Sequence, residues 1–528
     1  MPNKNILLIE PGYKNKYPPL GLMKIAAYHG PYGKKDNVKF IKGDKDRSVF
    51  NSNWDRIYVT TLFSFEWVEI AKTIDSAIAI AKGDTTKVFV GGIAASLMHE
   101  RFITEPRWRG VRFISGLLSS SPSESLQLDD FTEELYSDDF SGTPIEDLVP
   151  DYSILDQIQD QYIYPVHDAY FAYASRGCVR KCHFCGVPKL EGDQRDAQSI
   201  TSLIKAIEER HGPKRDLMLM DNNVVASKNY KNIIAEIRDN GFQKGAMFLR
   251  QGKQAIQRRV DFNQGVDARI LCKDKMYLEE MATIAIRPLR IAFDHLGVRK
   301  PYETAIHMAH EVGLHDLSNY MLYNFKDTPA DLYERMRLNI DLNEKLNIRI
   351  FSFPMRYQPT DLPNRSFVSE NWNRYYLRSI QIILQATHGI VSGSPEFFQT
   401  AFGGDKEQFE SLLLRPQHFL FNRFWYEKYE GRAEFDSFET DFKRLTMEER
   451  HELANLLSGT TPKGFAGLIG KASSSKVNHI LSYYVPLPQN EEAEIWKVMR
   501  QRLKDSKTIA ALIPEDELVE DAGLTETA

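Results

Sequence analysis

The sequence predicts an α/β protein with two successive parallel-sheet regions and a mostly helical C-terminal region. Two observations lead to this prediction. Short apolar or β-branched runs alternate with segments of helical spacing in residues 1–118, and the alternation resumes more regularly near residue 165. From about residue 395 the strand-like runs stop, and helical, aromatic segments follow. A chain of 528 residues, 42% hydrophobic and 26% charged, suits two to four globular domains.

The first region, residues 1–118, contains five strand-like runs and a helical segment at 67–83. The five runs are ILLIEP, VKFI, RIYVTTLF, KVFVGG and VRFISG. Strands alternating with helices favour a Rossmann-like parallel sheet wrapped by helices. Glycines follow the strand ends, where such sheets place a ligand crevice, although ordinary turns also use glycine. No GxGxxG follows the first run, which disfavours a dinucleotide.

A linker is predicted between the two sheet regions. Residues 119–151 are rich in Ser, Asp and Glu and contain no Lys or Arg. Such a composition is typical of an exposed linker or wrapping segment, which we place at 119–164.

The second region, residues 165–394, contains six strand-like runs separated by helical segments. The runs are AYFAYAS, DLMLMD, VDFNQG, LRIAFDH, LSNYMLYN and RIFSFPM. Gly241 and Gly313 stand where helix C-caps belong. Six βα repeats predict a partial (β/α)6 barrel, with the active site at the carboxyl ends of the strands. A helical extension, 395–528, ends in an acidic tail that we expect to be frayed.

Three of the four cysteines lie close together in SRGCVRKCHFCG, at Cys178, Cys182 and Cys185. They could close a loop with a disulfide bond, bind zinc or bind an iron–sulfur cluster. A large chain of cytosolic composition disfavours disulfides. A structural zinc site needs four ligands, and His183 stands between two cysteines, where it would struggle to reach the same metal. Three thiolates on a four-iron cluster leave one iron open.

This segment resembles the signature of the radical S-adenosylmethionine (SAM) superfamily. That signature is CxxxCxxC after the first strand of a partial barrel, with an aromatic residue before the third cysteine, here Phe184. The resemblance implies that Cys178, Cys182 and Cys185 bind a [4Fe-4S] cluster whose fourth iron is chelated by SAM. Reductive cleavage of SAM would then give a 5'-deoxyadenosyl radical, with electrons from a donor such as flavodoxin or ferredoxin. Phe184 would pack by the adenine.

The resemblance also suggests roles for residues at the ends of the second and third strands. At the second, MDNNVV stands where the family often shows GGE, so Asp221, Asn222 and Asn223 could accept hydrogen bonds from the SAM ammonium. The asparagines could instead only cap the following helix. At the third, Asn263 and Gln264 could bind ribose hydroxyls.

Three further residues are site candidates. Arg269 could pair with the SAM carboxylate or form a surface ion pair. Asp294 fits an acidic position that related sequences show after the fourth strand. His295 could contact substrate or transfer a proton, or could be a packing histidine.

The lead-in SRGC and the upstream α/β region are similar to the branch with an N-terminal cobalamin-binding-like domain. Segments 17–30 and 90–96 match that module, but its DxHxxG motif is absent. The resemblance therefore leaves open whether cobalamin binds. The segment YNFKDTPADLYERM resembles the family's GxPxET segment with Asn324 in place of glycine, and Cys272 is expected to be a packed thiol.

Two rival functions remain. A nucleic-acid modifier would use a basic run that contains Arg250, Lys253, Arg258 and Arg259, although the net charge of -5 provides no general attraction for phosphates. A non-catalytic iron–sulfur protein would sense redox state or scaffold a partner.

No apolar stretch approaches the roughly 20 residues of a membrane span, so we expect a cytoplasmic protein. The substrate is not indicated.

Overall fold

The computed structural model describes residues 3–118, 144–249, 252, 254–387, 389–391 and 393–505. Most of the acidic run of the predicted linker, residues 119–143, lies outside the described residues, as does the predicted acidic tail. The chain divides into two compact units. The first comprises Met1–Ala292, Lys300–Leu317 and Gln358–Phe367, and the second comprises Phe293–Arg299, Ser318–Tyr357 and Val368–Ala528.

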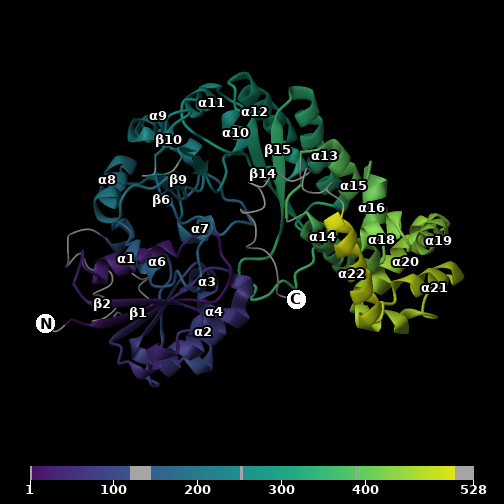
Figure 1. Ribbon diagram of the computed structural model, residues 1–528, viewed down its shortest axis with the longest axis horizontal. Helices are drawn as coiled ribbons and strands as arrows, with labels where there is room; N and C mark the ends of the chain where they lie inside the picture. The colour runs from purple at the N-terminus through teal and green to yellow at the C-terminus, as the bar shows by residue number, and fades with distance from the viewer. Residues whose placement is uncertain are drawn as a thin grey trace. The chain divides into compact units, whose positions relative to one another are not determined.

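A five-stranded parallel sheet forms the N-terminal part of the first unit (Figure 1). Its strands, in the order in which they pair, are β2 (Asn37–Lys42), β1 (Asn5–Glu10), β3 (Arg56–Thr61), β4 (Val88–Gly92) and β5 (Arg112–Phe113). The connecting helices are α1 (Leu20–His29), α2 (Trp67–Ile80), α3 (Ile93–Leu97) and α4 (His99–Ile103). All five predicted strands are confirmed, although β5 has only two residues, and α2 confirms the helix predicted at 67–83.

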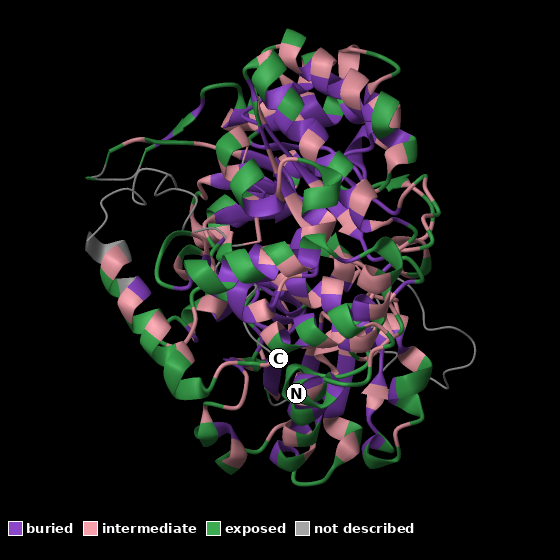
Figure 2. Ribbon diagram, turned by 90° about the vertical axis from the view of Figure 1, so that its right-hand side faces the viewer, coloured by how far each residue is buried: buried purple, intermediate pink, exposed green. Residues whose placement is uncertain are grey.

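Burial explains why these segments form a layered sheet. Strand β1 reads NILLIE and only its first residue escapes full burial, as expected when helices cover both faces of a sheet. Helix α2 buries Ile70, Ile74 and Ala77 at helical spacing against the sheet, while its other side carries exposed residues. Figure 2 shows many helices that carry both buried and exposed residues along their length. The strand order 2-1-3-4-5 is that of a doubly wound sheet, in which the ligand crevice lies beyond the carboxyl ends of β1 and β3.

The first unit also contains four of the six strands predicted in the second region. Strands β6 (Ala169–Ala172), β9 (Asp216–Leu219) and β12 (Val260–Phe262) form a parallel sheet with β9 in the centre. Parallel bridges from Val260 to Ile286 and from Val266 to Ile291 place the segment of β13 (Leu289–Arg290) next to β12. The first four predicted strands therefore lie side by side in chain order.

Helices and two short antiparallel ribbons connect these strands. The helices are α6 (Ser153–Asp156), α7 (Val187–Leu190), α8 (Ile200–His211), α9 (Tyr230–Ile237), α10 (Ala268–Leu271), α11 (Met276–Met281) and α12 (Arg299–Glu311). The ribbons pair β7 (Ser175–Arg176) with β8 (Arg195–Asp196), and β10 (Met247–Phe248) with β11 (Ile256–Gln257). Gly313 has a φ of +80° just after α12, as its predicted C-cap position requires.

The remaining two predicted strands, β14 (Asp316–Tyr323) and β15 (Arg349–Arg356), are neighbours in one sheet, and α13 (Pro329–Leu346) connects them. After β15 the described residues form helices, as predicted. These are α14 (Arg374–Ala386), α15 (Pro395–Phe402), α16 (Lys406–Leu413), α17 (Gln417–Phe421), α18 (Arg423–Lys428), α19 (Arg432–Lys443), α20 (Met447–Ser458), α21 (Ser475–Ile480) and α22 (Gln489–Asp505). Aromatic side chains such as Phe419, Phe438 and Tyr484 form the core of this helical part.

Asn324 shows why an asparagine can replace the glycine of the resembled segment. It follows β14 with a φ of +65°, in the left-handed region that asparagine tolerates better than most residues. Its buried side chain accepts a hydrogen bond from the Ser369 N–H (3.0 Å) and donates one to the Tyr357 carbonyl (3.2 Å). The side-chain amide therefore holds two neighbouring turns together, which glycine could not do.

Candidate active site at the cysteine loop

The three clustered cysteines lie in one closed loop, residues 177–194, which we call the cysteine loop. Strands β7 and β8 pair immediately outside its two ends, and Gln194 donates a hydrogen bond to the Ser175 hydroxyl (2.8 Å). Gly177 opens the loop with a φ of +72°, and a Cβ there would lie 2.1 Å from the Asp193 carbonyl oxygen. Only glycine therefore fits where the loop leaves the sheet, and the loop is anchored at the carboxyl end of β6.

The local backbone prepares the cysteines to bind as thiolates. The Arg180 N–H points at Cys178 Sγ (3.4 Å) and the Val187 N–H at Cys185 Sγ (3.5 Å). Hydrogen bonds to cysteine sulfur are a normal feature of iron–sulfur sites, where they tune the reduction potential. All three thiols are partly exposed. A closed loop with three accessible sulfurs, two of them receiving N–H groups, fits the donor set of a [4Fe-4S] cluster.

Within the described ranges, no group of three or more His, Cys, Asp or Glu side chains is arranged to hold a single metal ion. His183 is exposed, and Cys272 is partly buried just after α10.

Asp221, at the end of β9, holds the start of the cysteine loop in place. Its buried carboxylate accepts hydrogen bonds from the Ala174 N–H (2.9 Å), the Ser175 N–H (2.5 Å) and the Ser175 hydroxyl (2.7 Å). Burial raises the pKa of Asp221 to about 6, although these hydrogen bonds oppose the shift. Asp221 is predicted as an acceptor for a ligand ammonium, and in the structure its oxygens contact Ala174 and Ser175, just before the cysteine loop.

We predict that Asp221 makes stability depend on pH. Because its folded pKa of about 6 lies above the ordinary 3.8, its contribution is complete below about pH 4 and is lost as the pH rises through about 6. A shift of about two units corresponds to about 3 kcal/mol. Unfolding midpoints in urea should fall between about pH 4 and pH 7 less steeply in Asp221→Asn than in the wild type. Asp239→Asn, which changes an exposed carboxylate of the same unit, should keep the wild-type slope; an identical slope for Asp221→Asn would contradict the prediction.

Asn222 and Asn223 both bond to protein groups near the loop. The Asn222 side chain donates to Glu191 Oε2 (3.0 Å), and the Asn223 side chain accepts from the Asp267 N–H (3.4 Å). Asn223 precedes a short 3-10 turn without a capping hydrogen bond from its side chain. The capping alternative is therefore not what the structure shows for Asn223.

At the end of β12 the predicted residues differ in their exposure. Asn263 is buried and accepts a hydrogen bond from the Tyr17 hydroxyl (2.5 Å), whereas Gln264 is exposed. Arg269 forms an ion pair through Nε with Asp267 Oδ1 (2.7 Å), and its guanidinium also interacts with Cys182. Asp267 bonds Arg180 of the cysteine loop through its other oxygen (2.6 Å). Arg269 therefore forms an ion pair within the protein, which was the predicted alternative to binding the SAM carboxylate. This ion pair lies against the cysteine loop.

Asp294 and His295 belong to the second unit. Asp294 is half-buried, and its backbone carbonyl accepts a hydrogen bond from Arg335 (2.9 Å). His295 is exposed. Phe184, in the first unit, is half-buried within the cysteine loop.

Sequence reasoning missed Arg335, which organises the ends of the fourth and fifth strands. This fully buried side chain of α13 donates to the carbonyls of Phe293 (3.2 Å) and Leu322 (2.8 Å), besides that of Asp294. It also forms an ion pair with Asp327 (2.8 Å). An arginine on the apolar face of a helical segment was the available signal, since buried arginines are rarely unpaired.

The N-terminal sheet meets the cysteine loop through α3. A Cβ at Gly186 would lie 3.2 Å from Leu97 Cδ1, which shows how closely the loop packs on the end of this helix. Gly91 and Gly92, which end β4 just before α3, are partly and fully exposed. Gly92 has a φ of +102°, and a Cβ there would lie 2.4 Å from the Thr61 carbonyl oxygen, so glycine is required where β4 turns into α3.

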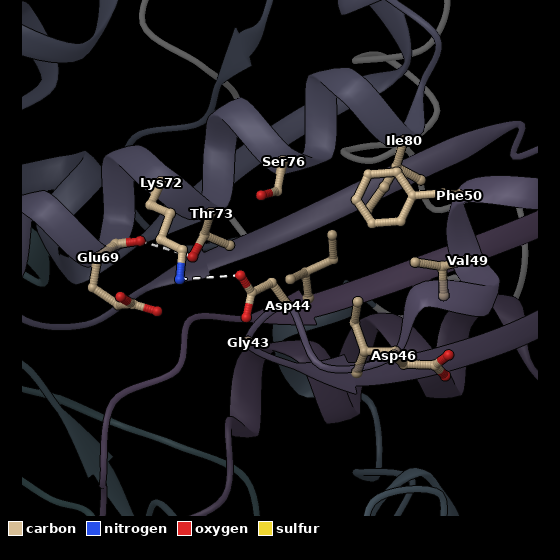
Figure 3. Close-up of a pocket in the computed structure, with 12 residues that line it drawn as sticks. Gly43, Asp44, Asp46, Val49, Phe50, Glu69, Lys72, Thr73, Ser76 and Ile80 are labelled. Atoms are coloured by element: carbon tan, nitrogen blue, oxygen red, sulfur yellow. Dashed lines mark hydrogen bonds and ion pairs between the residues drawn. The ribbon is translucent and has the colours of Figure 1, made fainter.

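The cleft in Figure 3 lies beside the same edge, between α2 and the ends of β1 and β2. Lys72 reaches across it to Asp44 (3.0 Å), and Glu69 accepts a hydrogen bond from the Gly12 N–H (3.1 Å). The polar groups of this cleft are therefore paired within the protein. The two histidines in residues 1–118 are placed elsewhere: His29 is buried between Asp36 (2.7 Å) and the Tyr58 hydroxyl (2.9 Å), and His99 begins α4.

The described part of the basic run is occupied by contacts within the protein. Arg258 donates to the carbonyls of Gly241 (3.2 Å) and Lys214 (3.2 Å), and Arg259 pairs with Asp216 (3.2 Å). Arg250 and Lys253 lie outside the described residues. The structure therefore gives no specific support to a nucleic-acid surface here.

Among the described residues, no helix combines the length and apolarity that crossing a membrane requires.

No protein-family model matches the chain, and no curated protein matches it. Several solved structures are similar to it. The cobalamin-dependent SAM radical enzyme OxsB, in its apo form, shares 14% identity with a TM-score of 0.46, over 99% of this chain and 83% of that one. The radical SAM methyltransferase TsrM from Kitasatospora setae, with cobalamin and a [4Fe-4S] cluster bound, shares 14% sequence identity with a TM-score of 0.43. The match covers 68% of this chain and 74% of the TsrM chain. SuiB from Streptococcus suis, bound to its precursor peptide SuiA, shares 12% over 47% and 53%, with a TM-score of 0.30.

Proposed function

We propose that the chain is a radical SAM enzyme in which Cys178, Cys182 and Cys185 hold a [4Fe-4S] cluster. The observation that carries the proposal is the closed cysteine loop at the carboxyl end of β6, with its three partly exposed thiols and two N–H groups directed at sulfur. When bound, the cluster and SAM together supply a one-electron cleavage that begins radical chemistry on a substrate. The substrate and the net reaction remain to be found.

The residues around the loop would bind and orient SAM. Phe184 would pack by the adenine, and Gln264, exposed at the end of β12, would contact the ribose. Asn263, held by Tyr17, would support that contact. Arg269 would bind the carboxylate, since its Nε contact with Asp267 fixes the planar guanidinium beside Cys182. Asp221, Asn222 and Asn223 would accept hydrogen bonds from the ammonium, with Asp221 held by Ser175 and Asn222 by Glu191.

We also assign roles to Asp294, as a cofactor-binding residue, and to His295. Asp294 is fixed through its carbonyl by Arg335, and the exposed His295 would contact substrate or transfer a proton. Histidine suits this task because its ordinary pKa lies near neutrality.

The activity test is anaerobic reconstitution with iron and sulfide, followed by dithionite and SAM. Dithionite stands in for an external one-electron donor such as flavodoxin or ferredoxin. We expect 5'-deoxyadenosine or methylthioadenosine to form in an amount that depends on both reductant and SAM. A protein that carries a full cluster and forms neither product would contradict the enzyme proposal and favour a non-catalytic iron–sulfur protein.

Whether cobalamin is used is decided by a second measurement. The strand order suits a ligand at the carboxyl edge of the sheet, while His29 is committed to Asp36 and Tyr58. Cobalamin at this edge would therefore bind without His29 as a ligand. A visible spectrum and a cobalamin assay after anaerobic purification separate methyl transfer, which would need cobalamin, from other radical outcomes.

A further inference from the structure

A buried arginine stands immediately before the cysteine loop. The Arg176 guanidinium stacks on the Tyr173 ring, with 3.8 Å from Cζ to the ring centroid. Its Nη1 lies 3.3 Å from Glu146 Oε1 and its Nε lies 3.2 Å from Glu191 Oε2. These nitrogens are at ion-pair distance without the alignment of hydrogen bonds, so the contacts are mainly electrostatic. Arg176 therefore joins two carboxylates that come from different parts of the chain.

Glu191 clamps the cysteine loop from within. The carboxylate oxygen that faces Arg176 also accepts hydrogen bonds from the Gly177 N–H (2.9 Å) and from the Asn222 side chain (3.0 Å). Gly177 begins the loop and Asn222 follows β9. A single carboxylate thus links the entry of the loop, its C-terminal half and the neighbouring strand end.

Glu146 connects Arg176 to helix α1 of the N-terminal sheet. Its Oε1 lies 2.9 Å from Lys24 Nζ, on the buried face of α1. Lys24 also lies over the Tyr173 ring, 5.7 Å from its centroid, so one ring contacts both cations. The residues Lys24, Glu146, Arg176 and Glu191 form a row of alternating charges from α1 to the cysteine loop, which we call the charge row.

Burial makes the members of the charge row depend on one another. The exposed fractions of these four side chains are 9%, 17%, 9% and 12%. Removing one partner of a buried pair leaves the other charge without compensation, which is strongly destabilising and moves the remaining groups. Residues in the outer shell of a metal site orient the metal ligands. Their loss typically lowers metal affinity or activity about 10- to 100-fold.

We propose that the charge row positions the cysteine loop for its cluster, with Arg176 and Glu191 as positioning residues and Lys24 as their anchor in the N-terminal domain. The inference rests on the proposed function, because it assigns the loop a cluster. It goes beyond that function in coupling α1 to the cluster through residues that touch neither cluster nor SAM.

The test compares Glu191→Gln with Asp193→Asn. Asp193 is an exposed carboxylate of the same loop that pairs only with exposed Lys181, so its removal changes the charge of the loop but not the charge row. Both reconstituted proteins and the wild type are treated with an iron chelator, and the EPR spectrum of the reduced cluster is recorded. We expect Glu191→Gln to lose iron about 10-fold faster with altered g-values. Asp193→Asn should behave as the wild type.

Two further arms keep the outcome decisive. Lys24→Met changes a residue outside the loop and should change iron loss and the EPR spectrum in the same direction as Glu191→Gln; it decides the matter if Glu191→Gln does not fold. In the cluster-free proteins, hydrogen exchange at the Gly177 amide should be faster in Glu191→Gln and Lys24→Met than in Asp193→Asn. Wild-type behaviour of both charge-row variants would overturn the inference. A wild type that binds no cluster would overturn the proposed function instead, while the exchange measurement still tests the charge row.

Discussion

Replacing Cys178, Cys182 or Cys185 singly by alanine should abolish the iron–sulfur cluster. Reconstituted wild type should contain about four irons per chain, and each variant should approach background, because three thiolates are the fewest that hold such a cluster with one open iron. Iron and sulfide assays with the visible spectrum measure this. SAM cleavage should disappear together with the cluster.

Cys272→Ser is the matched control. Cys272 lies after α10, where its N–H donates to the Ala268 carbonyl, and it belongs to no cysteine cluster in the sequence. Its replacement should leave iron content and spectrum unchanged. Full iron content in any of the three loop variants would remove the residue concerned from the ligand set.

Arg335→Met should lower the free energy of unfolding by about 3–5 kcal/mol. The substitution leaves Asp327 buried without its cation and takes a donor from the carbonyls of Phe293, Asp294 and Leu322. Burial already raises the pKa of Asp327 while Arg335 opposes the shift, so the unpaired carboxyl should take up a proton more readily in the variant. The thermal midpoint compared with the wild type measures the loss.

Arg337→Met provides the comparison on the same helix. Arg337 pairs with Asp341 one turn later (2.9 Å), and both side chains are substantially exposed. Exposed pairs of this kind contribute less than about 1 kcal/mol. Equal midpoints for the two variants would show that Arg335 does not have the structural role described.

The sequence predicted the strands and most of the helices because their signals are local. The burial of β1 and the helical spacing of α2 are visible in runs of six and fourteen residues. The spacing of the three cysteines, the aromatic Phe184 and the glycines at strand ends are likewise short-range patterns. Asn324 is an intermediate case, since it stands where the resembled segment has glycine and the structure shows a φ of +65°.

The candidate site was predicted as a set of residues but not as a set of contacts. Asp221 was expected to face a ligand, whereas it accepts hydrogen bonds from Ala174 and Ser175, about 46 residues away in the chain. No sequence pattern predicted the contacts of Glu191 and Lys24, and only the fold brings these residues to Arg176 and Glu146. The roles of the strand-end residues toward SAM, and the domain boundary near residue 395, stay predictions.

The amino-acid sequence by itself determined the alternation of strands and helices and the close spacing of the three cysteines, because backbone propensity and residue spacing reside in neighbouring residues. The tertiary structure alone decided which polar groups hold the loop and which lie exposed beside it, as Asp221 and Gln264 illustrate. The physical reason is that a buried charge or hydrogen-bonding group must be satisfied by whichever partner the fold brings within reach, and in this chain those partners are distant in sequence.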